Sequence, residues 1–304
     1  MSRWEIGDIT VHRIDEIALP AATGPWLLPD ATPQVVARHP WLEPDFAGAD
    51  GGLRLAVHSF ALEIGGLRVL VDTGIGNGKN RANPAWHQLD TPYLERLTAA
   101  GFAPSDVDLV ILTHLHADHV GWNTRPAADG SWQPTFTGAR YLTARTEYSH
   151  WDGAELEESR RQMLDDSVRP VHEHGLLDLV DVASEGTEVA PGLTLVPTPG
   201  HTPGQVAVVL NSGGRSAVIT GDCVHHPVQL AEPAVGSCVD IDPAQAARTR
   251  ARLLEQLADT DTLLLGSHFP APTGGLVRRD GDAFRLVPQP GSGTSASASA
   301  GDQR

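Results

Sequence analysis

The segment 108–122 constrains the fold and chemistry of this chain more than any other part of the sequence. An apolar run, 109–112, has the character of a buried strand and leads directly into four side chains that can bind metal ions: His114, His116, Asp118 and His119. In extended backbone the first two point to the same side, and a turn at Ala117 would bring the other two to the opposite side of one cavity. Imidazole together with carboxylate suits zinc and related first-row ions.

Three further candidate ligands follow other apolar runs, each directly beyond the end of a predicted strand. The runs 193–196, 216–220 and 262–265 precede, in order, His201, Asp222 and His268. Strand ends are where layered α/β proteins commonly place binding sites, because a rigid sheet supports the loops that carry polar groups. An isolated histidine is usually solvated or hydrogen-bonded, but chance would have to explain seven placements here. The sequence therefore predicts one metal site built from all seven residues.

In this order the seven residues resemble the full ligand set of the metallo-β-lactamase superfamily, and Asp72 matches that family's early Asp-Thr-Gly turn. The resemblance runs from about residue 50 to 275. It implies an α/β fold, a four-layer αββα sandwich, with the metals at one edge of the two sheets. It also implies an assignment of ligands: His114, His116 and His201 on one metal, Asp118, His119 and His268 on the other, and Asp222 bridging both.

The position of Asp222 narrows the subgroup that this chain resembles. The true β-lactamases carry Cys or Ser there, so the aspartate argues against hydrolysis of β-lactam antibiotics. The complete His/Asp set resembles instead the homoserine-lactone lactonases and the methyl parathion hydrolase group, and the segment 221–230 is especially similar to the latter. The resemblance implies hydrolysis of an ester-type bond, with a lactone as the first substrate class and an aryl ester or organophosphate triester as the alternative.

The expected cofactors are two divalent metal ions, zinc first, with manganese, iron or cobalt as alternatives. Metal-bound water can have its pKa lowered to about 7, so a metal-bridging hydroxide is expected to attack a carbonyl carbon. Asp118 is expected to orient this hydroxide and later carry its proton. His225 lies three residues beyond Asp222, where lactonases of the superfamily offer a tyrosine hydroxyl. It is either a catalytic donor to the oxyanion or leaving oxygen, or a histidine bonded to backbone near the site.

The remaining patterns predict strands mixed with helices in one domain, residues 1–287. Strands are expected over 4–17 and 53–72, with a tight turn at Gly65-Gly66, and over the short apolar runs of the second half, including 205–210. Helices are expected over three ranges: 92–101, about 155–174, and 242–259 with Asp242 as its N-cap. The low-complexity segment 288–304 is expected to be a disordered tail.

Residues 20–52 are rich in Pro, Trp and Gly without a clear period. A segment of this kind is either a lid or binding loop, or an arm packed on a subunit partner, which leaves a homodimer open. Several aromatic side chains are expected either to form an apolar pocket wall or to pack in the core: Trp26, Trp41, Phe46, Trp86 and Trp122.

The formal net charge of −16 argues against a nucleic-acid partner and against an anionic membrane surface, because both would be repelled at long range. A small-molecule substrate is expected instead. The segment 1–8 lacks the apolar core of a secretory signal, and no run is long enough to span a bilayer, so a cytoplasmic location is expected. The two cysteines, Cys223 and Cys238, are expected to be small buried thiols.

Three other functional classes use similar ligands. A nuclease shares the pattern, but the acidity of the chain and the lack of an obvious added domain count against it. An iron-dependent oxidoreductase is compatible with the same side chains, because they also accept iron. A metal-binding domain without catalysis is disfavoured, since no ligand position is missing.

Overall fold

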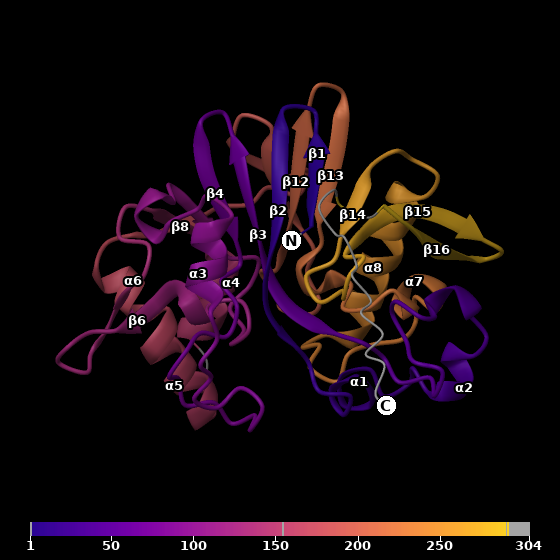
Figure 1. The fold of residues 1–304 in the computed structure, drawn as a ribbon, viewed down its shortest axis with the longest axis horizontal. Coiled ribbons are helices and arrows are strands. Elements are labelled where there is room, and N and C mark those ends of the chain that lie inside the picture. The colour runs from indigo at the N-terminus through magenta and orange to yellow at the C-terminus, as the bar shows by residue number, and fades with distance from the viewer. Residues whose placement is uncertain (1, 154, 290, 292–304) are drawn as a thin grey trace, which may run out of the picture.

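Two seven-stranded sheets lie face to face in the computed structural model, which describes residues 2–153, 155–289 and 291 (Figure 1). The first sheet contains, in spatial order, β1 (Arg3–Ile6), β2 (Ile9–Ala18), β3 (Ala56–Ile64), β4 (Leu67–Val71), β5 (Leu109–Ile111), β8 (Arg140–Ala144) and β9 (Leu177–Val180). The second contains β10 (Thr187–Ala190), β11 (Leu193–Pro197), β12 (Val206–Ser212), β13 (Arg215–Ile219), β14 (Leu263–Leu265), β15 (Gly274–Asp280) and β16 (Ala283–Pro288). A small separate sheet pairs β6 (Thr124–Pro126) with β7 (Trp132–Pro134).

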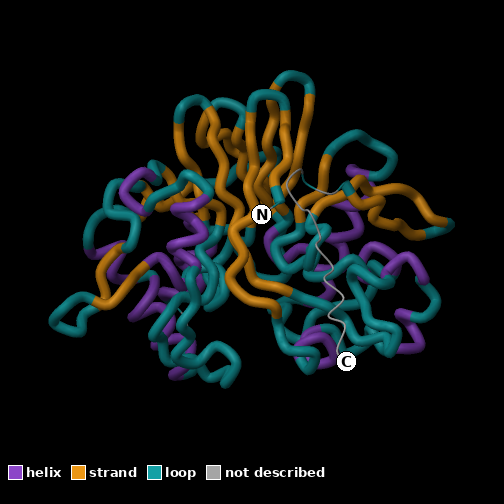
Figure 2. Tube along the Cα trace, viewed as in Figure 1, coloured by secondary structure: helices purple, strands orange, loops and turns teal. Residues whose placement is uncertain are grey.

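Helices cover the outer face of each sheet, as the purple segments of Figure 2 show. The first sheet is covered by α3 (Tyr93–Ala99), α4 (Arg145–Asp152), α5 (Glu158–Ser167) and α6 (Arg169–Glu173). The second is covered by α1 (Thr23–Leu27), α2 (Pro33–Val36), α7 (Val228–Ala231) and α8 (Pro243–Leu257). Short 3₁₀ helices are η1 (Pro40–Leu42), η2 (Pro104–Asp106), η3 (Gly121–Asn123) and η4 (Gly221–Cys223). The predicted αββα sandwich is confirmed.

The core between the sheets is made by side chains that alternate along the strands. Phe60 and Leu62 of β3 face Val208 and Leu210 of β12 across one continuous apolar cluster, and all four are almost fully buried. Every second residue of a strand points to the same face, so these positions form one apolar surface per sheet. Burial of these surfaces holds the two halves of the chain together.

Parallel strand pairs bring the loops that carry polar residues to a common edge. β4 pairs parallel with β5, and β13 pairs parallel with β14, whereas most other neighbours are antiparallel. The carboxyl ends of parallel neighbours lie at the same edge of a sheet, so the loops that leave these four strands start close together.

Most of the predicted elements are confirmed, with one correction. The helix expected over 155–174 is two helices, α5 and α6, which meet at Val168. Pro170 explains the break, because it lacks a backbone N–H and its ring excludes the helical carbonyl arrangement before it. In α8 the predicted cap forms, with Asp242 Oδ1 accepting a hydrogen bond from Gln245 N at 2.9 Å.

The segment 20–52 packs on the outer side of the second sheet, beside α7 in Figure 1. Leu28, Leu42 and Phe46 are fully buried there, in the same cluster as Leu254 of α8. The segment is thus joined to the core of its own chain, while a role in contacting a subunit partner stays a prediction.

The ordered chain reaches beyond the expected start of the tail. Pro288 belongs to β16, and Gln289 N donates to Gly274 O at 2.9 Å while Trp4 Nε1 donates to Gln289 O at 2.8 Å. Pro288 lies in a strand and Gln289 is hydrogen-bonded on both sides, so the expected boundary at 288 is wrong by at least two positions. Residues 290 and 292–304 of the predicted tail lie outside the described residues, and the single-domain division stays a prediction.

The two cysteines differ in their environments, and one prediction about them is wrong. Cys223 is buried in η4, as expected, and its burial raises the pKa of its thiol. Cys238 is exposed, in the loop between α7 and α8. Among the helices of the described chain, none combines the length and hydropathy needed to cross a lipid bilayer.

Candidate metal centre

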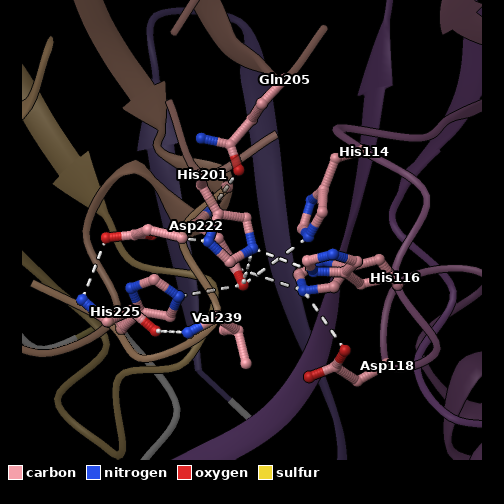
Figure 3. Close-up of polar contacts among 12 residues, drawn as sticks. His114, His116, Asp118, His201, Gln205, Asp222, His225 and Val239 are labelled. Carbon is pink, nitrogen blue, oxygen red and sulfur yellow. Dashed lines mark hydrogen bonds and ion pairs between the residues drawn. The ribbon is translucent and has the colours of Figure 1, made fainter. Parts of the chain in front are cut away.

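All seven predicted ligands lie in loops that leave strand ends at one edge of the sandwich. The loop after β5 carries four of them, the loop after β11 carries His201, η4 follows β13 and carries Asp222, and the loop after β14 carries His268. Figure 3 shows the rings of His114, His116 and His201 directed toward the same space as Asp222. Residues separated by more than 150 positions in sequence therefore meet in one site.

The seven side chains form two groups whose potential ligand atoms lie within 4.8 Å of one another. The first group contains His114, His116, His201 and Asp222. The second group contains Asp118, His119 and His268. The sets agree with the division that the family resemblance implies.

Asp222 lies between the two groups and directs one oxygen toward each. Its Oδ1 is 3.2 Å from His119 Nε2 and 3.1 Å from His268 Nε2. Its Oδ2 is 3.3 Å from His201 Nε2 and 3.7 Å from His114 Nε2. One carboxylate therefore faces both ligand groups.

Hydrogen-bond partners behind the histidines orient their rings. His119 Nδ1 lies 2.8 Å from Asp72 Oδ2, and His201 Nδ1 lies 2.9 Å from Asp240 Oδ1. His268 Nδ1 lies 3.0 Å from the carbonyl oxygen of Ala56. Because each Nδ1 faces an acceptor, that nitrogen can keep its proton while a bound metal ion takes the Nε2 lone pair.

Asp72 connects the ends of two strands as well as supporting a ligand. Its Oδ1 accepts from Thr113 N at 2.8 Å, and its Oδ2 accepts from the Thr113 hydroxyl at 2.9 Å. Its backbone has a φ of +56°, a conformation in which aspartate is more common than most residues. The turn directs the chain out of β4 and beneath the loop of His119.

The chemistry of the donor set fits divalent first-row ions. His114 Nε2 and Asp222 Oδ1 are buried and have no hydrogen-bond partner within the described part of the chain. Buried polar atoms without partners are rare in proteins, and lone pairs that converge in this way are what a metal ion binds. His201 Nε2 and His116 Nδ1 also face each other at 2.9 Å, as ring nitrogens do around a shared cation.

Burial and neighbouring charges set the protonation of this cluster. Burial lowers the pKa of His114 and of His116 well below the ordinary histidine value, so both rings are neutral and able to donate lone pairs. Burial alone would raise the pKa of Asp222, but His268 and His119 hold it well below the usual aspartate value. The carboxylate is thus ionised, as a metal ligand must be.

A cavity of about 800 Å³ opens onto both groups. Its polar floor contains His116, Asp118, Asp222, His225 and His268, and its apolar walls include Trp26, Leu27, Trp86 and Met163. Trp26 and Trp86 are therefore wall residues, as one of the two open interpretations predicted. Trp122, Phe46 and Trp41 pack in the core, which was the other interpretation. A separate cavity of about 900 Å³, near Arg54 and Pro270, contains none of the seven ligands.

His225 is buried beside the centre and lines this cavity. Its Nε2 lies 3.3 Å from Asp222 Oδ2, and its backbone N donates to Gln229 Oε1 at 2.7 Å. The ring makes no hydrogen bond to backbone among the residues described, so the interpretation as a backbone-bonded histidine finds no support. Both ring nitrogens are buried and have no hydrogen-bond partner among the described residues.

Three supporting residues were missed from the sequence because no local motif marks them. Asp240 supports His201, and Gln205 Oε1 accepts from Asp222 N at 3.2 Å. Glu147 of α4 is fully buried, and its oxygens accept from Leu115 N at 2.9 Å and from Gly204 N at 3.1 Å. It ties together the loops that hold the ligands of the first group. The partners of Glu147 lie far from it in sequence, so its role is visible only in the folded structure.

A four-layer αββα sandwich with paired His/Asp groups at one sheet edge defines a class of metal-binding proteins. The family model described as "Metallo-beta-lactamase superfamily" matches residues 52–268, and the chain belongs to this superfamily. The expectation of a hydrolase with metal-binding residues is supported at this level.

Sequence relatives and solved structures agree with this membership. A probable metallo-hydrolase of Mycobacterium tuberculosis is 28% identical over 251 residues, covering 72% of this chain and 76% of that protein. N-acyl homoserine lactonase AiiA of Bacillus thuringiensis is 26% identical over 182 residues, covering 55% of this chain and 63% of the lactonase. The structure of AidC, a dizinc quorum-quenching lactonase, matches with a TM-score of 0.74 at 21% identity, covering 94% of this chain and 96% of the other. The hydrolase AbOPH matches with a TM-score of 0.74 at 23% identity, covering 95% and 97%. At these identities the structural likeness establishes the fold.

Proposed function

We propose that this protein is a dinuclear-metal hydrolase that cleaves an ester-type bond, with a lactone as its first substrate class. The observation that carries the proposal is the division of the two Asp222 oxygens between the two ligand groups. A carboxylate in that position suits a pair of ions rather than one. The cavity beside it has the volume of a small-molecule site, which supports a small-molecule substrate.

The residues that would hold the first ion are His114, His116 and His201; those for the second are Asp118, His119 and His268, and Asp222 would contact both. When bound, such ions supply water that ionises near neutral pH and polarise a carbonyl oxygen. Zinc is the ion we propose first, with manganese, iron or cobalt as alternatives, because imidazole and carboxylate accept all four.

Asp118 is the ligand best placed to handle the proton. Its side chain is 13% exposed, whereas that of Asp222 is 5% exposed, and it faces the cavity. In the proposed reaction, water adds its oxygen to the carbonyl carbon and gives its proton to Asp118. The carbon–oxygen bond to the leaving group then breaks, and Asp118 returns the proton to the leaving oxygen. A lactone would open to a hydroxy acid.

His225 would donate a hydrogen bond to the substrate oxygen that becomes negative. The role is supported by its place in the cavity lining and by its ring nitrogens, neither of which has a hydrogen-bond partner among the described residues. Replacement His225→Ala is expected to lower kcat about 10²-fold on the best substrate while metal content stays full. Unchanged turnover in a fully metal-loaded variant would contradict the role.

Lactones come first because AidC and AiiA, to which this chain is similar, are named as lactonases. The second candidate is an aryl ester or organophosphate triester hydrolase. The specific observation for it is the pair of indole rings, Trp26 and Trp86, in the cavity wall, since they suit an aromatic leaving group.

The test is a pH-stat assay of metal-replete enzyme on acyl lactones, phenyl esters and phosphotriesters, with metal analysis of the same sample. We expect two ions per chain and the highest kcat/KM on a lactone. Faster hydrolysis of phosphotriesters than of lactones would make the second candidate function the preferred one. Absence of hydrolysis together with metal-dependent oxygen uptake would favour the oxidoreductase alternative, and cleavage of nucleic acid would favour the nuclease. Cytoplasmic location and a homodimer stay predictions.

A further inference from the structure

An arginine beside the metal-binding groups forms no side-chain hydrogen bond or ion pair with the described residues. Arg160 of α5 lines the same cavity as His116 and Asp118. Its guanidinium carbon lies 4.7 Å from the centre of the Trp151 ring, and that ring lies 5.7 Å from the ring of His116. One aromatic ring thus separates the guanidinium from a candidate ligand.

Three carboxylates act on the charge of Arg160: Glu157, which lines the same cavity, the candidate ligand Asp118, and Glu147. Arg81, the second arginine of the cavity wall, forms a two-pronged ion pair with Asp166 at 2.7 and 2.9 Å. Glu147, an acid near Arg160, uses its oxygens on backbone N–H groups and on Trp151 Nε1. For Arg160 itself, no side-chain hydrogen bond or ion pair forms within residues 2–153 and 155–289.

These carboxylates offset part of the cost of burying the Arg160 charge, but none forms an ion pair with it, so its N–H groups have no acceptor among the described residues. Burial lowers the pKa of Arg160, but an arginine stays charged at any physiological pH. Stacking on an indole covers one face of the guanidinium and leaves its N–H edge free. That planar edge matches the two oxygens of a carboxylate, or those of another oxyanion.

We infer that the substrate carries an anionic group, which Arg160 binds, while its apolar body lies against Trp26, Leu27 and Met163. The inference rests on the proposed function and names the substrate class of the same site: lactones or esters that bear a carboxylate or similar oxyanion away from the bond that is cleaved. The net charge of −16 does not oppose this, because exposed charges are screened beyond about 10 Å whereas Arg160 acts at contact.

The test uses two esters that differ only at the far end of the acyl chain. Para-nitrophenyl pentanoate ends in a methyl group, and mono-para-nitrophenyl glutarate ends in a carboxylate at the same position. The wild-type enzyme is expected to prefer the glutarate, mainly through a lower KM. Arg160→Met is expected to lower the ratio of the two kcat/KM values about tenfold, as for the loss of one charged hydrogen-bond pair. Arg160→Lys should recover part of the preference.

Arg161→Met is the matched control, because Arg161 is the next residue of α5, is exposed and donates to Leu156 O at 2.9 Å. This variant is expected to keep the wild-type ratio. An equal ratio in the wild type and in Arg160→Met, with both esters hydrolysed, would overturn the inference and leave the proposed function standing.

A binding measurement distinguishes failure of the ester-hydrolase proposal from failure of the inference about Arg160. If the metal-loaded enzyme hydrolysed neither ester, the ester-hydrolase proposal would fail, and calorimetry with the stable para-nitroanilides of the same two acids would decide the inference. Tighter binding of the glutaric anilide that is lost in Arg160→Met supports it. Equal binding of both anilides overturns it, and melting temperatures of the variants show that each is folded.

Discussion

At the scale of single residues, the site depends on side chains that hold the ligands rather than on the ligands alone. Asp72 contacts His119, and Asp240 contacts His201, at 2.8 and 2.9 Å. Each carboxylate fixes the proton on Nδ1 and increases the basicity of Nε2. The two acids therefore tune different groups of the same centre.

Replacing each acid by its amide should weaken one ion and spare the other. Asp72→Asn is expected to weaken metal binding by the second group about 10- to 100-fold, and Asp240→Asn to weaken binding by the first group to a similar extent. Competition with a chromophoric chelator measures the two affinities separately. The two variants serve as controls for each other, and a loss of the same ion in both would contradict the assignment.

At the scale of elements, the cavity wall after β4 is attached to α5 by buried charges. Lys79, the only lysine in the sequence, is fully buried and donates to Thr124 Oγ1 at 2.7 Å and to Asp166 O at 3.1 Å. Arg81 binds the carboxylate of the same aspartate. These contacts hold the segment that carries Trp86 against the helix that carries Arg160.

The burial of Lys79 in these contacts should make the free energy of unfolding depend on pH. Burial lowers the pKa of Lys79 from about 10.5 to about 7, an effect that Asp166 only partly offsets. Between these values the unfolded chain binds a proton that the folded chain does not, so stability rises with pH, by about 1.4 kcal/mol per pH unit from this group. Below pH 7 both states are protonated, so the cost of burying the charged lysine is constant and this group no longer makes stability change with pH.

The variant Lys79→Met should lack this rise. Denaturant unfolding of both proteins at several pH values between 7 and 10 measures the difference. Nuclear magnetic resonance of nitrogen-labelled lysine gives a second check, because the single side chain should titrate near pH 7. A midpoint near 10 would contradict the argument.

The loop before His201 depends on a glycine that packs against α8. Gly200 has a φ of +134°, and a Cβ there would lie 2.2 Å from Ala246 N. Gly200→Ala is therefore expected to cost about 3 kcal/mol, from the backbone conformation and from the clash with α8.

Gly214→Ala separates these two causes, because Gly214 has a φ of +76° and nothing lies within 4 Å of its Cβ position. That variant should cost about 1–2 kcal/mol, from the backbone alone. Equal unfolding free energies for the two variants would show that the packing of Gly200 on α8 does not contribute to stability.

At the scale of the whole molecule, the candidate ligands connect the two sheets. His114 and His119 follow β5 of the first sheet, whereas Asp222 and His268 follow β13 and β14 of the second. Ions bound at this centre would tie the two halves of the sandwich together at one edge. Metal binding and global stability should therefore be linked.

Removing the ions is expected to lower the free energy of unfolding. An ion present at 100 times its Kd contributes about 2.7 kcal/mol, so chelation should shift the melting temperature downward by several degrees. Calorimetry before and after dialysis against a chelator measures the shift, and restoration by added zinc is the control. The same melting temperature in both samples would mean that no ion links the sheets.

The sequence by itself predicted the kind of fold, through the family resemblance, and the candidate ligands that the structure brings together. Short apolar runs predicted β3, β4 and the strands of the second half. His201, Asp222 and His268 were predicted as candidate ligands because each follows the end of one of these strands. These inferences succeed because strand period and loop position are local properties, which a short stretch of chain reveals.

Only the tertiary structure decided which atoms face one another. The division of the Asp222 oxygens, the support by Asp240 and Glu147, and the free guanidinium of Arg160 all join segments that no local pattern connects. The break between α5 and α6 and the ordered Gln289 also differ from the sequence prediction. Such contacts depend on how the two sheets and their helices pack, since burial and distance arise only when distant parts of the chain are brought together.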